Sequence, residues 1–115
     1  MTAPVIDSAT FAELQDSAGA DFVAELFGTF LEETPALLDE LAQARQVGDA
    51  DCFRRAAHSI KSNSQTFGAL ALGALARDLE LQGLHADPAH DKQAIAELGH
   101  AYAQAAAALK EMARV

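Results

Sequence analysis

The sequence predicts an all-α protein that folds as an antiparallel up-and-down four-helix bundle, with a short N-terminal helix covering one end. Alanine is abundant, whereas β-branched residues are few and scattered. No alternation of apolar and polar residues reaches the length of a strand. Four long segments instead repeat their apolar residues every three or four positions and are joined by short links. The 115 residues are expected to form one domain, 1–115.

The first predicted helix is short. Asp7 or Ser8 can accept hydrogen bonds from the free N–H groups of its first turn. Ile6 and Phe11 have the spacing of a hydrophobic staple, and Gly19 is expected to end the helix.

A second predicted helix begins at Asp21 and carries a broad apolar face. The residues expected on or beside that face are Phe22, Val23, Leu26, Phe27, Phe30 and Leu31. Pro35 then interrupts the pattern. Because proline cannot donate to the helical hydrogen bonds, either the helix kinks there or a new helix begins with Thr34 as its cap. In both cases the chain should keep its direction. The apolar stripe is expected to continue to Val47, before a turn at Gly48, through Leu37, Leu38, Leu41 and Ala44.

The segment between Asp49 and Gly68 is predicted to form the helix around which the chain is organised. At about 100° per residue, one side of this helix collects apolar and small residues: Phe53, Ala56, Ala57, Ile60, Ser64 and Phe67. The opposite side carries polar and charged residues: Arg54, His58, Lys61, Ser62 and Gln65, with Arg55 at its edge. A protein with a net charge of −9 is therefore expected to present an imidazole to solvent on a basic helix face.

Two more helices complete the predicted bundle. One follows Gly68 and ends near Gly83, with Leu72, Leu75 and Leu79 on its core face and Leu70, Ala74 and Leu81 beside it. Residues 84–91 are expected to form the longest loop. The last helix spaces its apolar residues in threes and fours, at Ile95, Leu98, Tyr102, Ala105, Leu109 and Met112.

Composition limits the partners and the compartment. A surface with a net charge of −9 would be repelled by nucleic acids and by anionic membranes, so neither is expected as a partner. The single cysteine, Cys52, cannot form an internal disulfide and is expected to be a small buried residue. With no signal peptide and no apolar run of spanning length, the chain is expected in the cytoplasm. One bundle uses the apolar faces fully, so a monomer is expected.

His58 can be interpreted in two ways. A lone histidine on a helix is most often a solvated surface residue. Against that interpretation, Arg54, Arg55 and Lys61 lie within four residues of it in a chain poor in basic residues. A neutral imidazole has a nitrogen lone pair that can act as a nucleophile, and a nearby ammonium would favour that form and could hold an anionic group placed on the ring. These residues favour phosphorylation of the histidine.

Metal binding fits His58 less well. The residues four before and four after it are Arg54 and Ser62, and no carboxylate or thiolate is expected on that face. The other histidines also lack ligand spacing and are interpreted as solvated residues: His85, His90 and His100.

The run from His58 to Ala69, HSIKSNSQTFGA, resembles the signature of histidine-containing phosphotransfer (HPt) domains. That signature has His, a small hydroxyl residue, an aliphatic residue, Lys, several small residues, then an apolar residue, Gly and often Ala. Residues 75–80, LARDLE, are similar to the segment that these domains place on the next helix, and the resemblance spans nearly the whole chain. One departure is Ser62, where the family commonly has glycine, although a small residue there still lets a partner approach the ring.

The resemblance implies a phosphorelay intermediate. Nε2 of His58 would accept a phosphoryl group from the aspartyl phosphate of one receiver domain and pass it to the aspartate of another. The implied partners are response-regulator receiver domains and a hybrid histidine kinase. The chain would bind no ATP and need no cofactor, because the receiver would supply Mg²⁺ and an acidic pocket. Lys61 matches the motif lysine and would stabilise charge on the phosphoryl oxygens.

The remaining candidate residues surround that pair. The residues expected to contact the phosphoryl group or the partner are Arg54, Arg55, Ser62 and Gln65. Gly68 is expected to form a closely packed turn. Glu80 could orient the histidine ring by a hydrogen bond across the helix pair, or it could form a surface salt bridge with Arg77.

Two alternative functions stay open at this point. The motif is also similar to the phosphorylated N-terminal domain of chemotaxis-type kinases, which would require a kinase domain downstream. This chain contains none, which favours a free-standing shuttle or an excised terminal domain of a hybrid kinase. The other alternative is a helical adaptor without chemistry, in which His58 is incidental.

Overall fold

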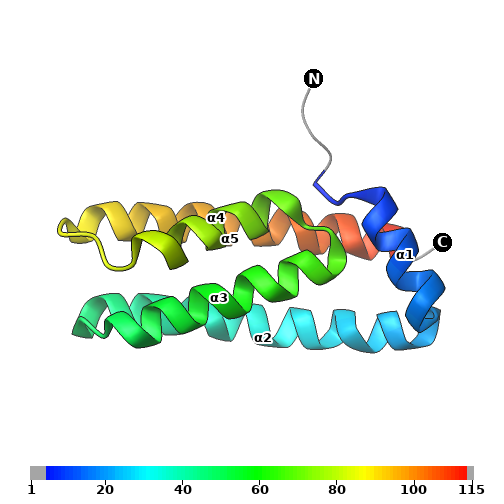
Figure 1. Ribbon diagram of the computed structural model, residues 1–115, viewed down its shortest axis with the longest axis horizontal. Coiled ribbons are helices and arrows are strands. Elements are labelled where there is room, and N and C mark those ends of the chain that lie inside the picture. The colour runs from blue at the N-terminus through cyan, green and yellow to red at the C-terminus, as the bar shows by residue number, and fades with distance from the viewer. Residues whose placement is uncertain (1–4, 114–115) are drawn as a thin grey trace, which may run out of the picture.

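The structure, a computed structural model, describes residues 5–113. Within them the chain forms five helices: α1 (Ser8–Ala18), α2 (Ala20–Val47), α3 (Ala50–Phe67), α4 (Leu70–Gln82) and α5 (Pro88–Ala113). Helices α2 to α5 form a bundle in which each packs on two others, in the cyclic order α2, α3, α4, α5 (Figure 1). Helix α1 lies across one end, against α2 and α3. The predicted all-α bundle with an N-terminal covering helix is therefore confirmed.

Single residues set the ends of α1 and α3. Asp7 accepts the Thr10 N–H at 3.2 Å, and Asp49 accepts the Cys52 N–H at 3.0 Å. Each carboxylate thus satisfies a donor that the first helical turn leaves free. Gly68 ends α3 with a φ of +77°, in a left-handed conformation that a residue with a Cβ adopts only with strain. These caps lie where the sequence predicts them.

Pro35 lies inside α2, which continues through it as one helix. The alternative in which a new helix begins after Thr34 is therefore wrong. A proline at this position leaves the carbonyl of Leu31, four residues earlier, without its helical N–H donor. The Tyr102 hydroxyl of α5 donates to that carbonyl at 3.4 Å, and burial raises the pKa of this phenol. The neighbouring helix thus compensates in part for the bond that proline removes.

Inward faces of all five helices contribute to one core. Its largest fully buried apolar side chains are Phe30, Leu41, Phe53, Ile60, Leu72, Leu98 and Leu109. Five large apolar residues expected on or beside core faces are exposed instead: Phe22 (50%), Leu31 (40%), Val47 (76%), Leu70 (57%) and Leu81 (70%). The smaller Ala74, also expected beside the core face, is exposed as well. Adjacent positions on a helix differ by about 100°, so Phe22 turns outward when Val23 faces the core. Leu81, two positions after the buried Leu79, lies about 200° away from it.

The loop between α4 and α5 is shorter than predicted, because α5 begins at Pro88 rather than after Asp91. Proline suits the first position of a helix, where a missing N–H removes no helical bond. Asp87 accepts the Ala89 N–H at 3.0 Å and so satisfies another donor of the first turn. Asp91 consequently lies within α5, where it is buried.

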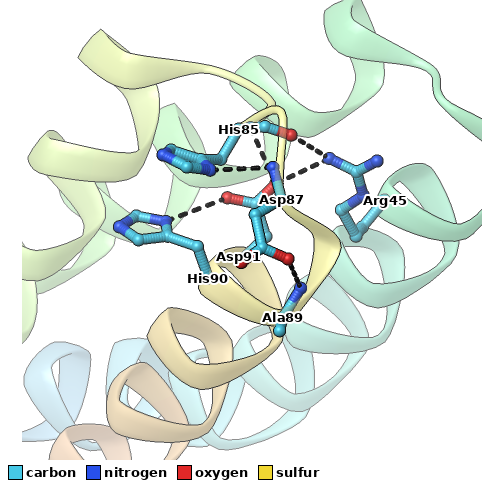
Figure 2. Close-up of polar contacts among 6 residues, drawn as sticks. All are labelled: Arg45, His85, Asp87, Ala89, His90 and Asp91. Atoms are coloured by element: carbon cyan, nitrogen blue, oxygen red, sulfur yellow. Dashed lines mark hydrogen bonds and ion pairs between the residues drawn. The ribbon is translucent and has the colours of Figure 1, made fainter.

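Polar contacts fix this loop to α2 (Figure 2). The Asp91 carboxylate accepts hydrogen bonds from Arg45 Nη1 and from the His85 amide, both at 2.9 Å, and Arg45 also donates to the His85 carbonyl at 2.7 Å. Burial alone would raise the pKa of Asp91, but the hydrogen bonds from Arg45 and the His85 amide lower it overall. The rings of His85 and His90 stack with centroids 4.0 Å apart. Both histidines are exposed, as predicted; His85 lies in the loop and His90 in the first turn of α5.

Candidate functional site

Helix α3 has the buried and exposed faces that its apolar spacing predicts. Its buried residues are Phe53, Ala56, Ala57, Ile60, Ser64 and Phe67. Phe67 packs against the rings of Phe27 and Phe30 from α2, which fixes the end of α3. His58 lies on the opposite side in the middle of the helix, with 57% of its side chain exposed. Its imidazole can therefore be reached from solvent.

A carboxylate from α4 contacts both motif residues of α3. Glu80 Oε2 lies 2.7 Å from His58 Nδ1, and Glu80 Oε1 accepts a hydrogen bond from Lys61 Nζ at 2.7 Å. The expectation that no carboxylate lies on this face is wrong, because it considered α3 alone. Of the two partners considered for Glu80, the structure shows the histidine rather than Arg77. The face is also less basic than predicted, since Glu80 neutralises one of its charges.

The same carboxylate decides which ring nitrogen carries a proton. The hydrogen bond from Lys61 is the main cause of a lowered pKa for Glu80, so this carboxyl group is ionised at neutral pH. An ionised carboxylate only accepts hydrogen bonds, so Nδ1 of His58 must be the protonated, donating nitrogen. In the neutral ring Nε2 then holds the lone pair. The nitrogen that is not bound to Glu80 is therefore the nucleophilic one.

The predicted partner-binding residues surround His58 on the exposed side of α3. All four are exposed: Arg54, Arg55, Ser62 and Gln65. Arg54 reaches the C-terminal end of α4, where a Cβ at Gly83 would lie 3.3 Å from its Nε atom. Ser62 follows His58 by one helical turn, and its small side chain leaves space beside the ring. The structure thus brings the predicted residues to one face.

Gly68 joins α3 to the start of α1. The Asp7 N–H donates to the Gly68 carbonyl at 2.8 Å. A Cβ at Gly68 would lie 2.9 Å from Thr10 Cβ and 3.0 Å from the Asp7 carbonyl oxygen. Only glycine therefore satisfies both the left-handed turn and the close approach of α1.

The contact between His58 and Glu80 follows from the hairpin of α3 and α4. Two antiparallel helices joined by a short turn bring together residues equally distant from the turn. His58 and Glu80 are the eleventh residues before and after Ala69. This symmetry is the sequence signal that selects Glu80 as the partner of the ring. Arg45 and Asp91, 46 residues apart, carry no such signal.

Three further observations concern metal binding, membrane spanning and the cysteine. Among residues 5–113, no group of three or more His, Cys, Asp or Glu side chains is arranged to hold a metal ion. None of the described helices combines the length and the apolar character needed to cross a membrane. Cys52 is a free thiol that packs against the core, and it is partly buried rather than buried as expected.

Comparisons with known proteins agree with this geometry. The family model of the Hpt domain matches residues 25–112. Among solved structures, the chain is similar to histidine-containing phosphotransfer protein B (HptB) from Pseudomonas aeruginosa PAO1. The TM-score is 0.82 and the sequence identity is 26%, over 98% of this chain and 97% of that one. A sequence search of curated proteins gave no match.

Proposed function

Because this chain belongs to the HPt domain family, we propose that His58 carries a phosphoryl group between the aspartates of two receiver domains. The family interacts with receiver domains and kinases in phosphorelays, and this chain has a histidine phosphotransfer role of that kind. One observation supports His58, rather than another histidine, as the residue that carries the phosphoryl group. Its imidazole is exposed, with Nδ1 bound to Glu80 and Nε2 available to react.

In the proposed reaction the Nε2 lone pair attacks the phosphorus of an aspartyl phosphate. A P–N bond forms as the bond between phosphorus and the aspartate oxygen breaks, and the aspartate leaves as a carboxylate. The ring keeps its Nδ1 proton and becomes positively charged. Glu80 Oε2, 2.7 Å from Nδ1, offsets that charge. Transfer to the second receiver is the reverse step, with a free aspartate as the acceptor.

Lys61 is proposed to stabilise the phosphoryl oxygens. An ammonium carries three N–H bonds, and the single bond from Lys61 to Glu80 leaves donors for a phosphoryl group. Lys61 follows His58 by three residues and so lies on the same side of α3. In this proposal Mg²⁺ belongs to the receiver, and this chain mainly positions the ring.

We further propose that residues 1–115 form one HPt domain, which acts as a monomer in the cytoplasm. A single core shared by the described helices supports one domain. The exposed residues around His58 are proposed to contact the receiver: Arg54, Arg55, Ser62 and Gln65. Gly68 is proposed to form the closely packed turn between α3 and α4.

Incubation with a phosphorylated receiver domain tests the proposal. The wild-type chain should acquire a phosphate that is labile in acid and stable in base, as phosphohistidine is. His58→Gln should acquire none. His100→Gln, which removes an exposed histidine of α5, should be labelled like the wild type. ATP alone should label none of them.

Two results would contradict this function. Labelling of His58→Gln at the wild-type rate would place the phosphoryl group on another residue. If neither a panel of phosphorylated receivers nor phosphoramidate labelled the wild-type chain, a helical adaptor without chemistry would be the better explanation.

A further inference from the structure

The outward side of α4 carries a stripe that none of the described helices covers. Its members are spaced by four, three and four residues and all are exposed: Leu70, Ala74, Arg77 and Leu81. Leu70 and Leu81 are large apolar residues with 57% and 70% exposure. A bundle helix normally turns such residues toward the core. We call these four residues the α4 stripe.

Contacts between α3 and α4 place the C-terminal half of the stripe, Arg77 and Leu81, beside His58. Glu80 bonds to the His58 ring, and Gly83 lies against the Arg54 side chain. Because these two contacts are on the same side of α4, that side faces α3 along the half of the hairpin that holds the reactive ring. The exposed surface of α4 next to this side therefore borders the site.

The angular positions of residues on α4 show that this bordering surface is the stripe. Successive residues differ by about 100°, so Arg77 lies about 60° from Glu80 and Leu81 about 100°, in the same direction. The buried Leu79 lies about 100° from Glu80 in the other direction. The surface thus continues from the ring over Glu80 to Arg77 and Leu81.

Charge separates this face from the rest of the molecule. The described residues contain seven Lys and Arg, and four of them lie on α3 and α4: Arg54, Arg55, Lys61 and Arg77. These two helices carry three acidic residues, Asp51, Asp78 and Glu80, so they have a small positive balance. The whole chain has a net charge of −9. A receiver domain presents an anionic group at the point of transfer, either an aspartate or an aspartyl phosphate. The cations of this face are complementary to that partner.

We propose that a receiver domain docks across α3 and α4, with Leu81 and Leu70 as apolar contacts and Arg77 and Arg54 facing its anionic pocket. This inference rests on the proposed phosphorylation of His58 and identifies the surface that the partner covers. A second copy of the chain fits the face less well. A two-fold symmetric pair would bring these cations opposite those of the other copy.

Steady-state kinetics of phosphoryl transfer measure how much the α4 stripe contributes to binding of the receiver. The donor is the phosphorylated receiver that labels the wild-type chain fastest in a panel of purified receivers. Leu81→Ala should raise the KM for this receiver about five-fold and leave kcat near the wild-type value, since the side chain contributes to docking and not to chemistry. Phosphoramidate is small enough to react without docking, so it should label this variant at the wild-type rate.

Charge is tested in the same assay. Arg77→Ala should raise KM by about five-fold at low ionic strength and by less at high ionic strength, because salt screens exposed charges. The matched controls are Leu31→Ala, an exposed leucine whose carbonyl contacts α5, and Lys92→Ala, an exposed lysine of α5. Both controls should keep KM within about two-fold of the wild type.

The outcomes separate this inference from the proposed function. If no donor labels His58 in the wild type, the proposed function fails. If His58 is labelled but Leu81→Ala and Arg77→Ala keep the KM of their controls, only the docking face is wrong. The docking face is also wrong if the wild type is a dimer by light scattering and Leu81→Glu makes it a monomer, because a second copy then covers the stripe.

Discussion

Glu80 binds the ring and the ammonium of the site at once, so its removal should slow the reaction. In Glu80→Ala, Nδ1 of His58 loses its acceptor and both tautomers of the neutral ring become populated. We expect labelling by a receiver to slow about ten-fold, the lower end of the loss seen when the partner that orients a metal-binding histidine is removed. Glu80→Gln should keep the Nδ1-protonated tautomer, since the amide oxygen still accepts, but it loses the negative charge. Imidazole ¹⁵N NMR and initial labelling rates measure the two effects separately.

Glu97→Ala, which removes an exposed carboxylate of α5, is the control for both measurements. Its tautomer ratio and labelling rate should equal those of the wild type. An unchanged tautomer ratio in Glu80→Ala would show that this carboxylate does not orient the ring.

Ser62 should matter through its size. It is exposed one turn after His58, so an arginine there would occupy the space that a receiver must enter. Ser62→Arg should keep the helical circular dichroism and lose transfer from a receiver. Ser17→Arg, at an exposed position of α1, should keep both. Normal transfer to Ser62→Arg would mean that the receiver approaches from another side.

The turn that joins α3 to α4 also holds α1, and a pair of glycines can separate these two tasks. Gly48 and Gly68 have φ values of +78° and +77°, but a Cβ at Gly48 would have no atom within 4 Å. Gly48→Ala should therefore cost only the left-handed strain, about 1 kcal/mol. Gly68→Ala should cost about 2–3 kcal/mol, because its Cβ would also meet Thr10 and Asp7. Urea denaturation gives both values, and equal losses would contradict a packing role for Gly68.

The ends and the buried face of α3 depend on groups close together in the chain, and for this reason the sequence predicted them correctly. The Asp49 cap and the left-handed stop at Gly68 involve groups within a few residues. The continuity of α2 through Pro35 could not be predicted in this way, since it involves the Tyr102 hydroxyl from another helix. The burial of Phe22 was predicted wrongly for a similar reason. An apolar residue at the edge of a stripe is buried only if a neighbouring helix reaches it.

The stability of the whole molecule should depend on pH through Asp91, whose carboxylate connects α2, the last loop and α5. The folded state lowers its pKa below the ordinary value of about 3.9. A lowered pKa stabilises the folded state above that ordinary value, and the contribution disappears as the pH falls through the folded-state pKa. Asp91→Asn should therefore lower the free energy of unfolding by about 2 kcal/mol between pH 5 and 7, and by less below about pH 4.

Urea denaturation of the wild type and of Asp91→Asn from pH 3 to 7 measures the difference in their free energies of unfolding. Asp78→Asn, at an exposed position of α4, is the matched control and should follow the wild type throughout. A difference for Asp91→Asn that stayed constant down to pH 3 would contradict the titration of this carboxylate.

The residues of the site that lie on α3 could be predicted from the sequence. His58, Lys61 and their exposed neighbours share a face of α3, and periodicity alone placed them together. Glu80 stayed undecided because its partner depends on how α4 lies against α3. The contact of Arg45 with Asp91 was missed, since it joins segments whose relative position only the complete bundle determines.

Glu80 of α4 contacts both His58 and Lys61 of α3. The reactivity of the site therefore depends on the register between these two helices. A slip of α4 along α3 by a single residue, about 1.5 Å, would separate Glu80 from at least one of its partners. Heat or substitutions that let the two helices slide should therefore slow phosphoryl transfer while the bundle is still helical, so that activity declines before the helices melt.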